Sequence, residues 1–218
     1  LKHRITYNFY LRRCIVDDAV PLFVGIMKKR KFEFLLGMNR IVRPLYEGLK
    51  DYKEIEEYSE GSYFINKNFK PFILNDLNFR DIRGVDSKDV VDFVLNARIN
   101  GFNQIQTRES IKNTLIQREE EEDFIIGERN GKIVAQACIQ TYTPKINQIG
   151  GVYTVQDERN KGYCKAIVSE ICRRIVERGK LPTLSVVKNN LPAVKAYTSL
   201  GFKNYDDYLL VRYKQSVI

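Results

Sequence analysis

The pattern of apolar and polar positions predicts three short strands and two helices over residues 1–70. Apolar positions recur at helical spacing after Asp17 and Asp18, and again after Asn39, whose side chain is suited to capping a helix. Such a β-α-β-α-β run is typical of a layered α/β unit. The predicted strands are residues 5–12, residues 32–36 with Gly37 as their end, and residues 63–66, which follow the acidic stretch 54–60.

A second unit is predicted to begin at residue 71, because Phe69, Lys70 and Pro71 interrupt the pattern. Its helices are predicted by apolar positions spaced three and four apart. They cover residues 87–100, residues from Thr107 to the acidic run 119–123, and residues 191–200, and a further helix is opened by residues 159–164, with Ile167, Ile171 and Ile175 recurring every four residues. Its strands are predicted at residues 72–83, 124–127, 133–141, 146–155 and 184–187, with a final strand pair within residues 205–213.

Glycines mark two special places in this second unit. Asn130 and Gly131 separate two apolar runs, which predicts a tight β-hairpin. Gly150 and Gly151 lie together inside a predicted strand, which indicates a bulge or the close approach of a ligand.

Composition narrows the chemistry that this chain can perform. The 218 residues include one histidine, His3, and no tryptophan. This excludes a Ser-His-Asp triad with a buried histidine, a two-histidine zinc site and an HExxH helix. No metal is therefore expected. The cysteines lack CxxC spacing and are predicted to be free thiols in a reducing, cytoplasmic compartment. They are Cys14, Cys138, Cys164 and Cys172.

The net charge of +9 suits nucleic acid, an anionic membrane or a polyanionic small molecule as a partner. The densest basic run, residues 28–31, and the acidic run 119–123 are both predicted to be solvated helix ends. No run of ~18 apolar residues and no signal-peptide pattern occurs in the printed sequence, so no membrane partner is expected. Only the positive charge favours a nucleic-acid partner, and none is expected, because the sequence contains no recognised nucleic-acid-binding motif.

Residues 159–164, RNKGYC, follow a predicted strand and open a predicted helix. The first amides of a helix lack internal partners and lie at the positive end of its dipole, so they can hold an anion. Gly162 allows the backbone to approach a ligand closely, and Arg159 and Lys161 add positive charge. The alternative is an ordinary strand–helix turn with an incidental glycine.

A second motif follows at the fitting distance, on the helix that Asn190 caps and Gly201 ends. RNKGYC together with N-x-x-A-x-x-x-Y-x-x-x-G-F resembles the GNAT superfamily of acyl-CoA-dependent N-acyltransferases over residues 72–213. The phrase IGGVYTVQDERNKGY is similar to the FR47-like branch of that superfamily. The second motif consists of Asn190, Ala193, Tyr197, Gly201 and Phe202.

The resemblance implies an α/β (α+β) GNAT fold, with a mixed, twisted central sheet and flanking helices. It also implies a smaller β-α-β-α-β half-domain before it. Residues 1–70 are then a partial GNAT-like unit, and residues 71–218 are the catalytic GNAT domain.

The resemblance further implies acetyl-CoA as cosubstrate. Its pantetheine would lie between strand 146–155 and strand 183–187, which splay apart. Backbone groups would bind the pantetheine, loop amides would bind the pyrophosphate, and Cys164 replaces the usual glycine or alanine with another small residue. The implied cofactor-binding residues are Val152, Tyr153, Thr154, Arg159, Asn160, Lys161, Gly162, Tyr163, Cys164, Lys165 and Asn190.

Tyr197 matches the family's general acid, and the oxyanion would be stabilised by a backbone N–H near Tyr153. The alternative is that Tyr197 only packs between helix and sheet. Gln148 and Ser185 occupy the two positions where family members often carry a glutamate, and neither side chain takes a proton at neutral pH. The base is then supplied from elsewhere or by a water chain ending on a carboxylate, or the amine needs none.

The sequence thus predicts an N-acetyltransferase that moves acetyl from acetyl-CoA to a small-molecule or peptide amine. The alternative is a non-catalytic module with the GNAT fold that binds acyl-CoA or has a regulatory role. The acceptor and the oligomeric state, monomer or homodimer, stay open. Phe102, Tyr142 and Tyr153 are candidate walls of the acceptor groove or, equally, core residues.

Overall fold

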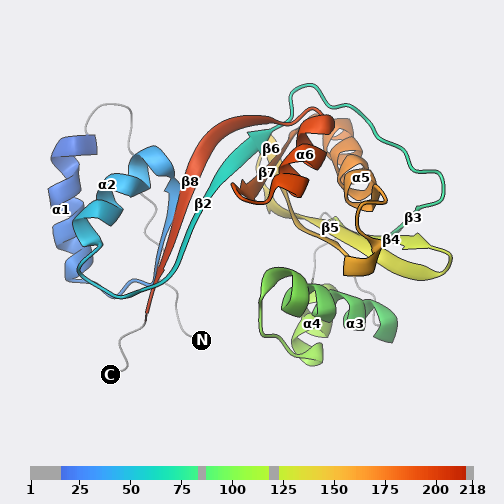
Figure 1. Cartoon of the computed structure of the whole chain (residues 1–218), viewed down its shortest axis with the longest axis horizontal. Coiled ribbons are helices and arrows are strands. Elements are labelled where there is room, and N and C mark those ends of the chain that lie inside the picture. Colours follow the sequence, from blue (N-terminus) through green and yellow to red (C-terminus); the bar gives the residue numbers. More distant parts are fainter. Residues whose placement is uncertain (1–15, 83–86, 118–122, 215–218) are drawn as a thin grey trace. The chain divides into compact units, whose positions relative to one another are not determined.

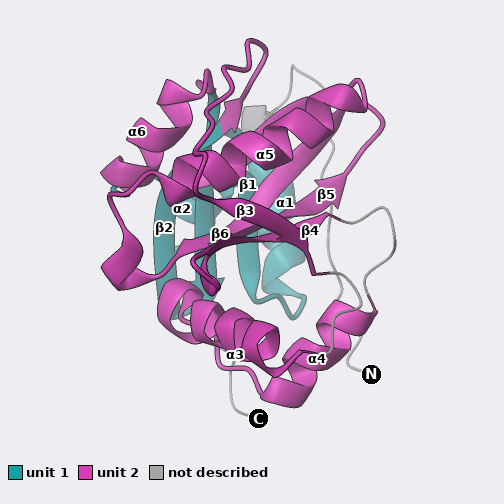
Figure 2. Ribbon diagram, turned by 90° about the vertical axis from the view of Figure 1, so that its right-hand side faces the viewer, with its two compact units in different colours: residues 1–63, 187–189, 204–218 teal, residues 64–186, 190–203 magenta. Residues whose placement is uncertain are grey.

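The computed structural model describes residues 16–82, 87–117 and 123–214, and of residues 16–18 only the backbone (Figure 1). The described residues form two compact units (Figure 2). Unit 1 contains the residues up to Tyr63, residues 187–189 and the residues from Asn204. Unit 2 contains Phe64–Val186 and Asn190–Lys203.

Unit 1 combines two helices with a group of strands. β1 and β8 pair antiparallel, and β8 neighbours β2. Apolar side chains of both helices pack on β8, as Leu45 and Leu49 do against Leu209 and Val211. The predicted helices are confirmed. The elements are α1 (Val16–Lys28), β1 (Phe34–Met38), α2 (Asn39–Leu49), β2 (Ile55–Ile65) and β8 (Lys203–Tyr213).

Three local predictions for unit 1 are wrong. Asn39 does not cap α2, because Met38 is the N-cap residue and the Asn39 amide oxygen instead accepts a hydrogen bond from Arg43 Nε at 3.0 Å. Gly37 does not end β1 but lies inside it, where an added Cβ would come within 3.0 Å of a Val42 methyl group. Residues 205–213 form one strand rather than a pair, because β8 stays in register with β1 from Tyr208 to Arg212. The predicted strand 5–12 lies outside the described residues.

β2 is longer than the sequence predicts. It begins at Ile55 and includes the acidic stretch that was expected to precede a strand at residues 63–66. Basic side chains of unit 1 pair with these carboxylates: Arg212 lies 3.5 Å from Glu56, and Arg43 lies 2.6 Å from Glu60. Like charges disfavour a strand in isolation, but partners on neighbouring elements remove that repulsion.

Unit 2 contains a sheet with the strand order β7-β6-β5-β4-β3. β6 and β7 run parallel, and the other neighbours pair antiparallel. The elements are β3 (Asn78–Asp81), α3 (Lys88–Asn96), α4 (Arg108–Ile116), β4 (Phe124–Arg129), β5 (Lys132–Tyr142), β6 (Ile146–Thr154), α5 (Tyr163–Glu177), β7 (Leu181–Val187) and α6 (Leu191–Ser199).

Helices cover both faces of this sheet (Figures 1 and 2). On one face, Ile167, Ile171 and Ile175 of α5 are fully buried in a core that also contains residues of β4 to β7 and α6. On the other face, α3 and α4 build a second core on β4 and β5. These two layers confirm the predicted α/β architecture with a mixed sheet.

The sequence predicts most elements of unit 2 and misplaces some ends. The Asn130–Gly131 hairpin is confirmed, with both residues at positive φ and Arg129 opposite Lys132. The strand expected over residues 72–83 is restricted to Asn78–Asp81. The helix expected over residues 87–100 ends as an α-helix at Asn96 and continues as a π-helical turn, Ala97–Gly101.

Asp123 is the clearest error in the second unit. It was expected on a solvated helix end, but its side chain is only 2% exposed and pairs with Arg174 at 3.1 Å and with Arg178. Residues 118–122 of the same acidic run lie outside the described residues. Arg174 lies in the last turn of α5 and Arg178 is its C-cap residue, so their proximity to Asp123 could not be inferred from the local sequence.

The compact units do not follow the expected ranges 1–70 and 71–218. Unit 2 begins at Phe64, and the final strand from Asn204 onward belongs to unit 1. Backbone pairing with β1 brings this strand to unit 1, and such long-range pairing is not encoded in a local pattern.

Candidate functional site

β6 and β7 are paired along only part of their length. The parallel pairing runs from Ile146 opposite Leu181 to Ile149 opposite Leu184, and within the described residues it does not extend further. The later parts of both strands, residues 150–154 and 185–187, therefore leave their facing edges open.

A bulge in β6 lies where this opening begins, as predicted. Gln136 of β5 is opposite Tyr153, and Cys138 is opposite Gly150, so β6 has one residue more than β5 in this interval. Gly151 has φ +59, and an added Cβ would come within 2.9 Å of the Cys138 sulfur. At Gly150 an added Cβ would lie 1.9 Å from the Gln140 side chain. The positive φ and the contact with Cys138 therefore require glycine at position 151, whereas the exposed Gln140 side chain can move away from a Cβ at position 150.

Strand alternation shows which backbone groups face the opening. The N–H of Val155 donates to the Val134 carbonyl at 3.0 Å, toward β5. Consecutive residues of a strand turn their N–H and C=O to opposite sides, so Val152 and Thr154 turn theirs toward the open edge. Tyr153 turns its backbone toward β5. Of the three residues expected to bind pantetheine, the geometry thus favours Val152 and Thr154.

The side chain of Tyr153 belongs to the core between β6 and the helices. Its hydroxyl donates to Asn96 Oδ1 at 3.0 Å, and its ring contacts the rings of Phe93 and Phe102 edge-on. Tyr142 has its hydroxyl fixed by the N–H of Asp123 at 2.9 Å. These contacts favour the core alternative for Tyr153.

The loop before α5 presents a row of backbone amides. Asn160 and Gly162 have φ +64 and +87, and the Gly162 carbonyl accepts the N–H of Ala166 at 2.9 Å, which starts the helix. Within the described residues, no backbone carbonyl accepts a hydrogen bond from the N–H groups of residues 160–165. These amides lie at the positive end of the α5 dipole, so the loop can hold an anion.

The basic side chains of this loop differ in whether they already have interaction partners in the protein. Lys161 pairs with Glu158 at 2.8 Å, and Lys165 lies 3.7 Å from the centre of the Phe72 ring. Arg159 is exposed, and its Nε donates to the Thr154 carbonyl at 3.4 Å. The charge at the loop is thus partly compensated, and the backbone amides are its main attraction for an anion.

Tyr163 contributes its backbone and not its side chain to the surface of the loop. The side chain is 2% exposed, and its hydroxyl accepts a hydrogen bond from Arg129 Nη1 at 2.5 Å. Arg129 also pairs with Asp76 at 2.6 Å. The start of α5 is therefore anchored to the β4–β5 hairpin.

Tyr197 and Cys164 form the apolar end of the candidate site. Tyr197 of α6 is 7% exposed and packs edge-on against Phe202. Burial, and then the nearby Cys164 thiol, raise the pKa of Tyr197 above its usual value. Burial also raises the pKa of the Cys164 thiol to about 11. Both groups are therefore protonated at neutral pH.

Asn190 is confirmed as the cap of α6, since its Oδ1 accepts the N–H of Ala193 at 3.3 Å. Thr154, on the open edge of β6, is 9% exposed, and its buried hydroxyl has no partner within the described residues. Gln148 is half-buried and Ser185 is exposed, and neither supplies an ionisable group. The structure thus adds no carboxylate at the two positions where the family often has one.

Gln136 is a residue that the sequence analysis missed. It is fully buried on β5, and its side-chain Nε2 donates to the Gly151 carbonyl at 3.0 Å. Its Oε1 has no partner within the described residues. The available signal was a single amide side chain within the otherwise apolar run 133–139.

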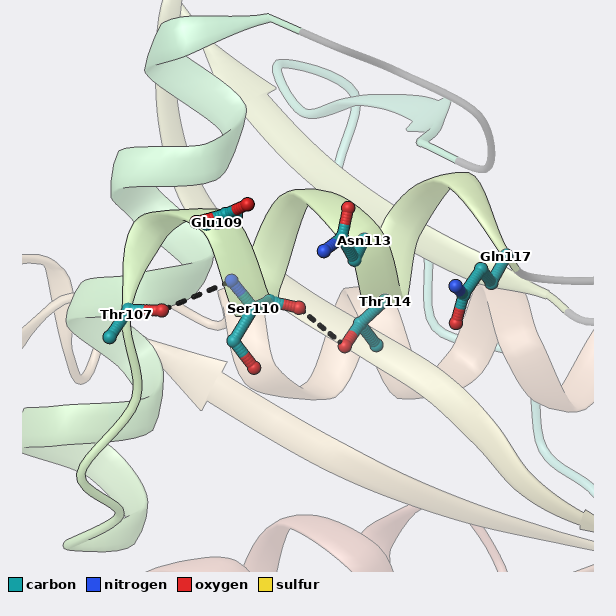
Figure 3. Close-up of a pocket in the computed structure, with 6 residues that line it drawn as sticks. All are labelled: Thr107, Glu109, Ser110, Asn113, Thr114 and Gln117. Carbon is teal, nitrogen blue, oxygen red and sulfur yellow. Dashed lines mark hydrogen bonds between the residues drawn. The ribbon is translucent and has the colours of Figure 1, made fainter. Parts of the chain in front are cut away.

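A shallow polar depression on α4 is separate from these groups (Figure 3). Its hydrogen bonds are internal to the helix: Thr107 accepts the N–H of Ser110, and Thr114 donates to the Ser110 carbonyl. It therefore offers no chemistry beyond helix capping. Among the described residues, no cluster of three or more His, Cys, Asp or Glu could hold a metal ion. No described helix is long and apolar enough to cross a membrane.

Solved structures show which fold this is. An acetyltransferase of the GNAT family from Colwellia psychrerythraea is 16% identical, with a TM-score of 0.66 over 95% of this chain and 76% of that one. A GCN5-related N-acetyltransferase from Sphaerobacter thermophilus is 14% identical, with a TM-score of 0.64 over 85% and 62%. One from Kribbella flavida is 15% identical, with a TM-score of 0.60 over 84% and 68%. The chain therefore has the GNAT fold.

Residues 125–211 match the family model described as FR47-like protein. The match spans β4 to β8, and so includes the bulge, the amide loop and α6. A search of curated protein sequences gave no match. The predicted resemblance to the GNAT superfamily and to its FR47-like branch is thus confirmed.

Proposed function

We propose that this chain is an acyl-CoA-dependent N-acyltransferase that transfers acetyl from acetyl-CoA to an amine. The observation that carries the proposal is the combination of an open edge on β6 with a row of unpaired amides at the start of α5. An extended amide chain ending in phosphates fits this combination, because the edge offers strand-like pairing and the loop offers an anion site.

The residues present fit coenzyme A. The Val152 carbonyl and the Thr154 backbone would pair with the pantetheine amides, which leaves the Val152 N–H for the acyl group, and the amides of residues 160–165 would bind the pyrophosphate. The unpartnered, buried hydroxyl of Thr154 supports a ligand on this edge, because buried polar groups are normally hydrogen-bonded. The bound thioester would supply the acyl group and a thiolate leaving group.

The chain's own groups would assist direct attack by the amine. The Val152 N–H faces the open edge and would stabilise negative charge on the acyl oxygen. Tyr197 would protonate the departing sulfur. Its raised pKa keeps it protonated over the physiological range, so that its hydroxyl can donate to the sulfur as negative charge develops there.

No side chain at positions 148 or 185 can remove the proton from the amine. We favour a water chain that leads to a carboxylate, although a base from elsewhere or an amine of low pKa would serve as well. The absence of a carboxylate at these positions also supports the second candidate, a GNAT-fold module that binds acyl-CoA without turnover.

Calorimetric titration with CoA tests the proposal. Gly162→Ala places a side chain at φ +87 and should weaken CoA binding about tenfold, since it displaces the loop amides. Gly179→Ala is the matched control, because Gly179 at the end of α5 also has positive φ, with nothing within 4 Å of an added Cβ. Gly179→Ala should lower stability similarly and leave binding unchanged.

The outcomes separate the two candidate functions. Failure of the wild-type protein to bind CoA, or equal effects of both glycine variants, would contradict an acyl-CoA site. Release of free CoA thiol from acetyl-CoA in the presence of one of a panel of amines indicates transfer. Tight binding with no release across the panel supports the non-catalytic module.

The domain ranges and the location belong to the same proposal. Residues 1–70 are proposed to be a partial GNAT-like unit, and residues 71–218 the catalytic one. A cytoplasmic location is supported by Cys164 and Cys172, which form no disulfide within the described residues.

A further inference from the structure

We infer that Gln136 is a positioning residue that aims the backbone N–H of Val152 at the acyl oxygen. The inference rests on the proposed function and deepens it. It assigns a role to a buried side chain that touches neither the cosubstrate nor the amine.

The geometry follows from the peptide bond between Gly151 and Val152. The Gly151 carbonyl and the Val152 N–H belong to one planar, trans peptide, so they point in opposite directions. Gln136 Nε2 donates to the Gly151 oxygen at 3.0 Å and holds it on the β5 side. The Val152 N–H must then point away from β5, toward the open edge of β6.

This peptide needs such an anchor. It lies in the bulge, where the regular ladder between β5 and β6 is interrupted, and Gly151 has φ +59, a conformation that does not fix the plane by itself. Beyond Ile149, β7 no longer pairs with β6 within the described residues and cannot hold the peptide from the other side. Gln136 is fully buried, so water does not compete for its N–H.

The same hydrogen bond also improves the donor. A carbonyl that accepts a hydrogen bond polarises its amide, which makes the N–H on the other side of the peptide a stronger donor. Gln136 thereby acts on the acyl oxygen through one peptide unit.

Carbon-13 NMR of acetyl-CoA labelled at the acetyl carbonyl tests this without knowledge of the acceptor. In the wild-type protein the bound carbonyl resonance should move downfield from its free position, because its oxygen accepts a hydrogen bond. Gln136→Met preserves length and removes the donor. It should lose most of that displacement while the CoA dissociation constant stays within about twofold, since the phosphates and the pantetheine are bound mainly by groups other than the Val152 N–H.

Gln140→Met is the matched control. Gln140 lies on the same strand and has its side chain beside Gly150, but it donates no hydrogen bond to the bulge peptide in the structure. Its variant should keep the wild-type carbonyl resonance. Once an acceptor is found, Gln136→Met should lower kcat about tenfold with little change in KM, a split that general destabilisation does not produce.

The outcomes distinguish this inference from the proposed function. Failure of the wild-type protein to bind acetyl-CoA overturns the proposed function. Binding with an unchanged downfield displacement in Gln136→Met overturns the positioning role alone. If Gln136→Met does not fold, spectra of the wild-type protein provide the test. The Val152 amide resonance must move further with acetyl-CoA than with CoA, and a coupling across the hydrogen bond must link Gln136 Nε2 to the Gly151 carbonyl carbon. Absence of either signal overturns the inference.

Discussion

Replacing Asp123 by asparagine should destabilise unit 2 strongly. The carboxylate is 2% exposed and accepts hydrogen bonds from Arg174, at 3.1 Å, and from Arg178. Breaking a buried ion pair costs about 3–5 kcal/mol, but the Arg174 and Arg178 side chains are 21% and 41% exposed and can recover some hydration. We therefore expect a loss of about 3 kcal/mol, or about 6–12 °C in melting temperature.

The pH dependence of that loss gives a second test. Desolvation by burial raises the pKa of Asp123, but the hydrogen bonds from Arg178 and Arg174 outweigh it, so the pKa lies below its usual value. Such a group stabilises the fold above its unfolded pKa of about 3.9 and loses this effect as pH falls through the lower folded value. The gap between wild type and Asp123→Asn should thus shrink below about pH 4.

Urea denaturation at pH 7 and at pH 3, with melting curves, measures both effects. Asp76→Asn is the control, since Asp76 pairs with Arg129 at 2.6 Å but its side chain is 48% exposed. An exposed pair contributes about 1 kcal/mol or less. Equal losses for the two variants at pH 7, or a gap at pH 3 as large as at pH 7, would refute the assignment of stability to buried ion pairs.

Two further variants test the site and the packing around it. Tyr197→Phe should lower kcat at least about 100-fold and leave CoA binding unchanged. The control is Tyr213→Phe, which removes a buried hydroxyl that has no partner in the described residues and should leave kcat unchanged. Equal kcat values for the two variants would contradict an acid role for Tyr197. Gly201→Ala should cost at least about 3 kcal/mol in urea denaturation, because Gly201 has φ +97 and its Cβ would lie 2.2 Å from the Asn68 carbonyl oxygen. Gly179→Ala, with open space, should cost about 1–2 kcal/mol, and a comparable loss at both glycines would show that the contact with Asn68 relaxes.

The loop and α6 could be predicted because their signals are local. Gly162 has positive φ, Asn190 caps α6 through the N–H of Ala193, and the pair Gly150–Gly151 marks a real bulge. Each depends on a residue and its close neighbours in sequence. The same holds for the hairpin at Asn130, where two positive φ values require the residues that are present.

The groups that the sequence did not predict depend on distant partners. The acidic residues next to Asp123 in the sequence predict a solvated carboxylate, but its ion pair with Arg174 of α5 places it in the interior. Gln136 is an isolated polar residue in an apolar strand until the bulge places the Gly151 carbonyl 3.0 Å from its amide. The acidic part of β2 becomes a strand because arginines of unit 1 pair with its carboxylates.

The sequence by itself determined the order of most elements, the loop that opens α5 and the likeness to GNAT proteins, because periodicity, caps and turn residues act over a few positions. Only the tertiary structure decided which strands pair, where β6 leaves β7, and which backbone N–H groups face that opening. Strand pairing joins residues far apart in the chain, and a one-residue bulge reverses the direction of every group beyond it, so neither can be derived from a local pattern.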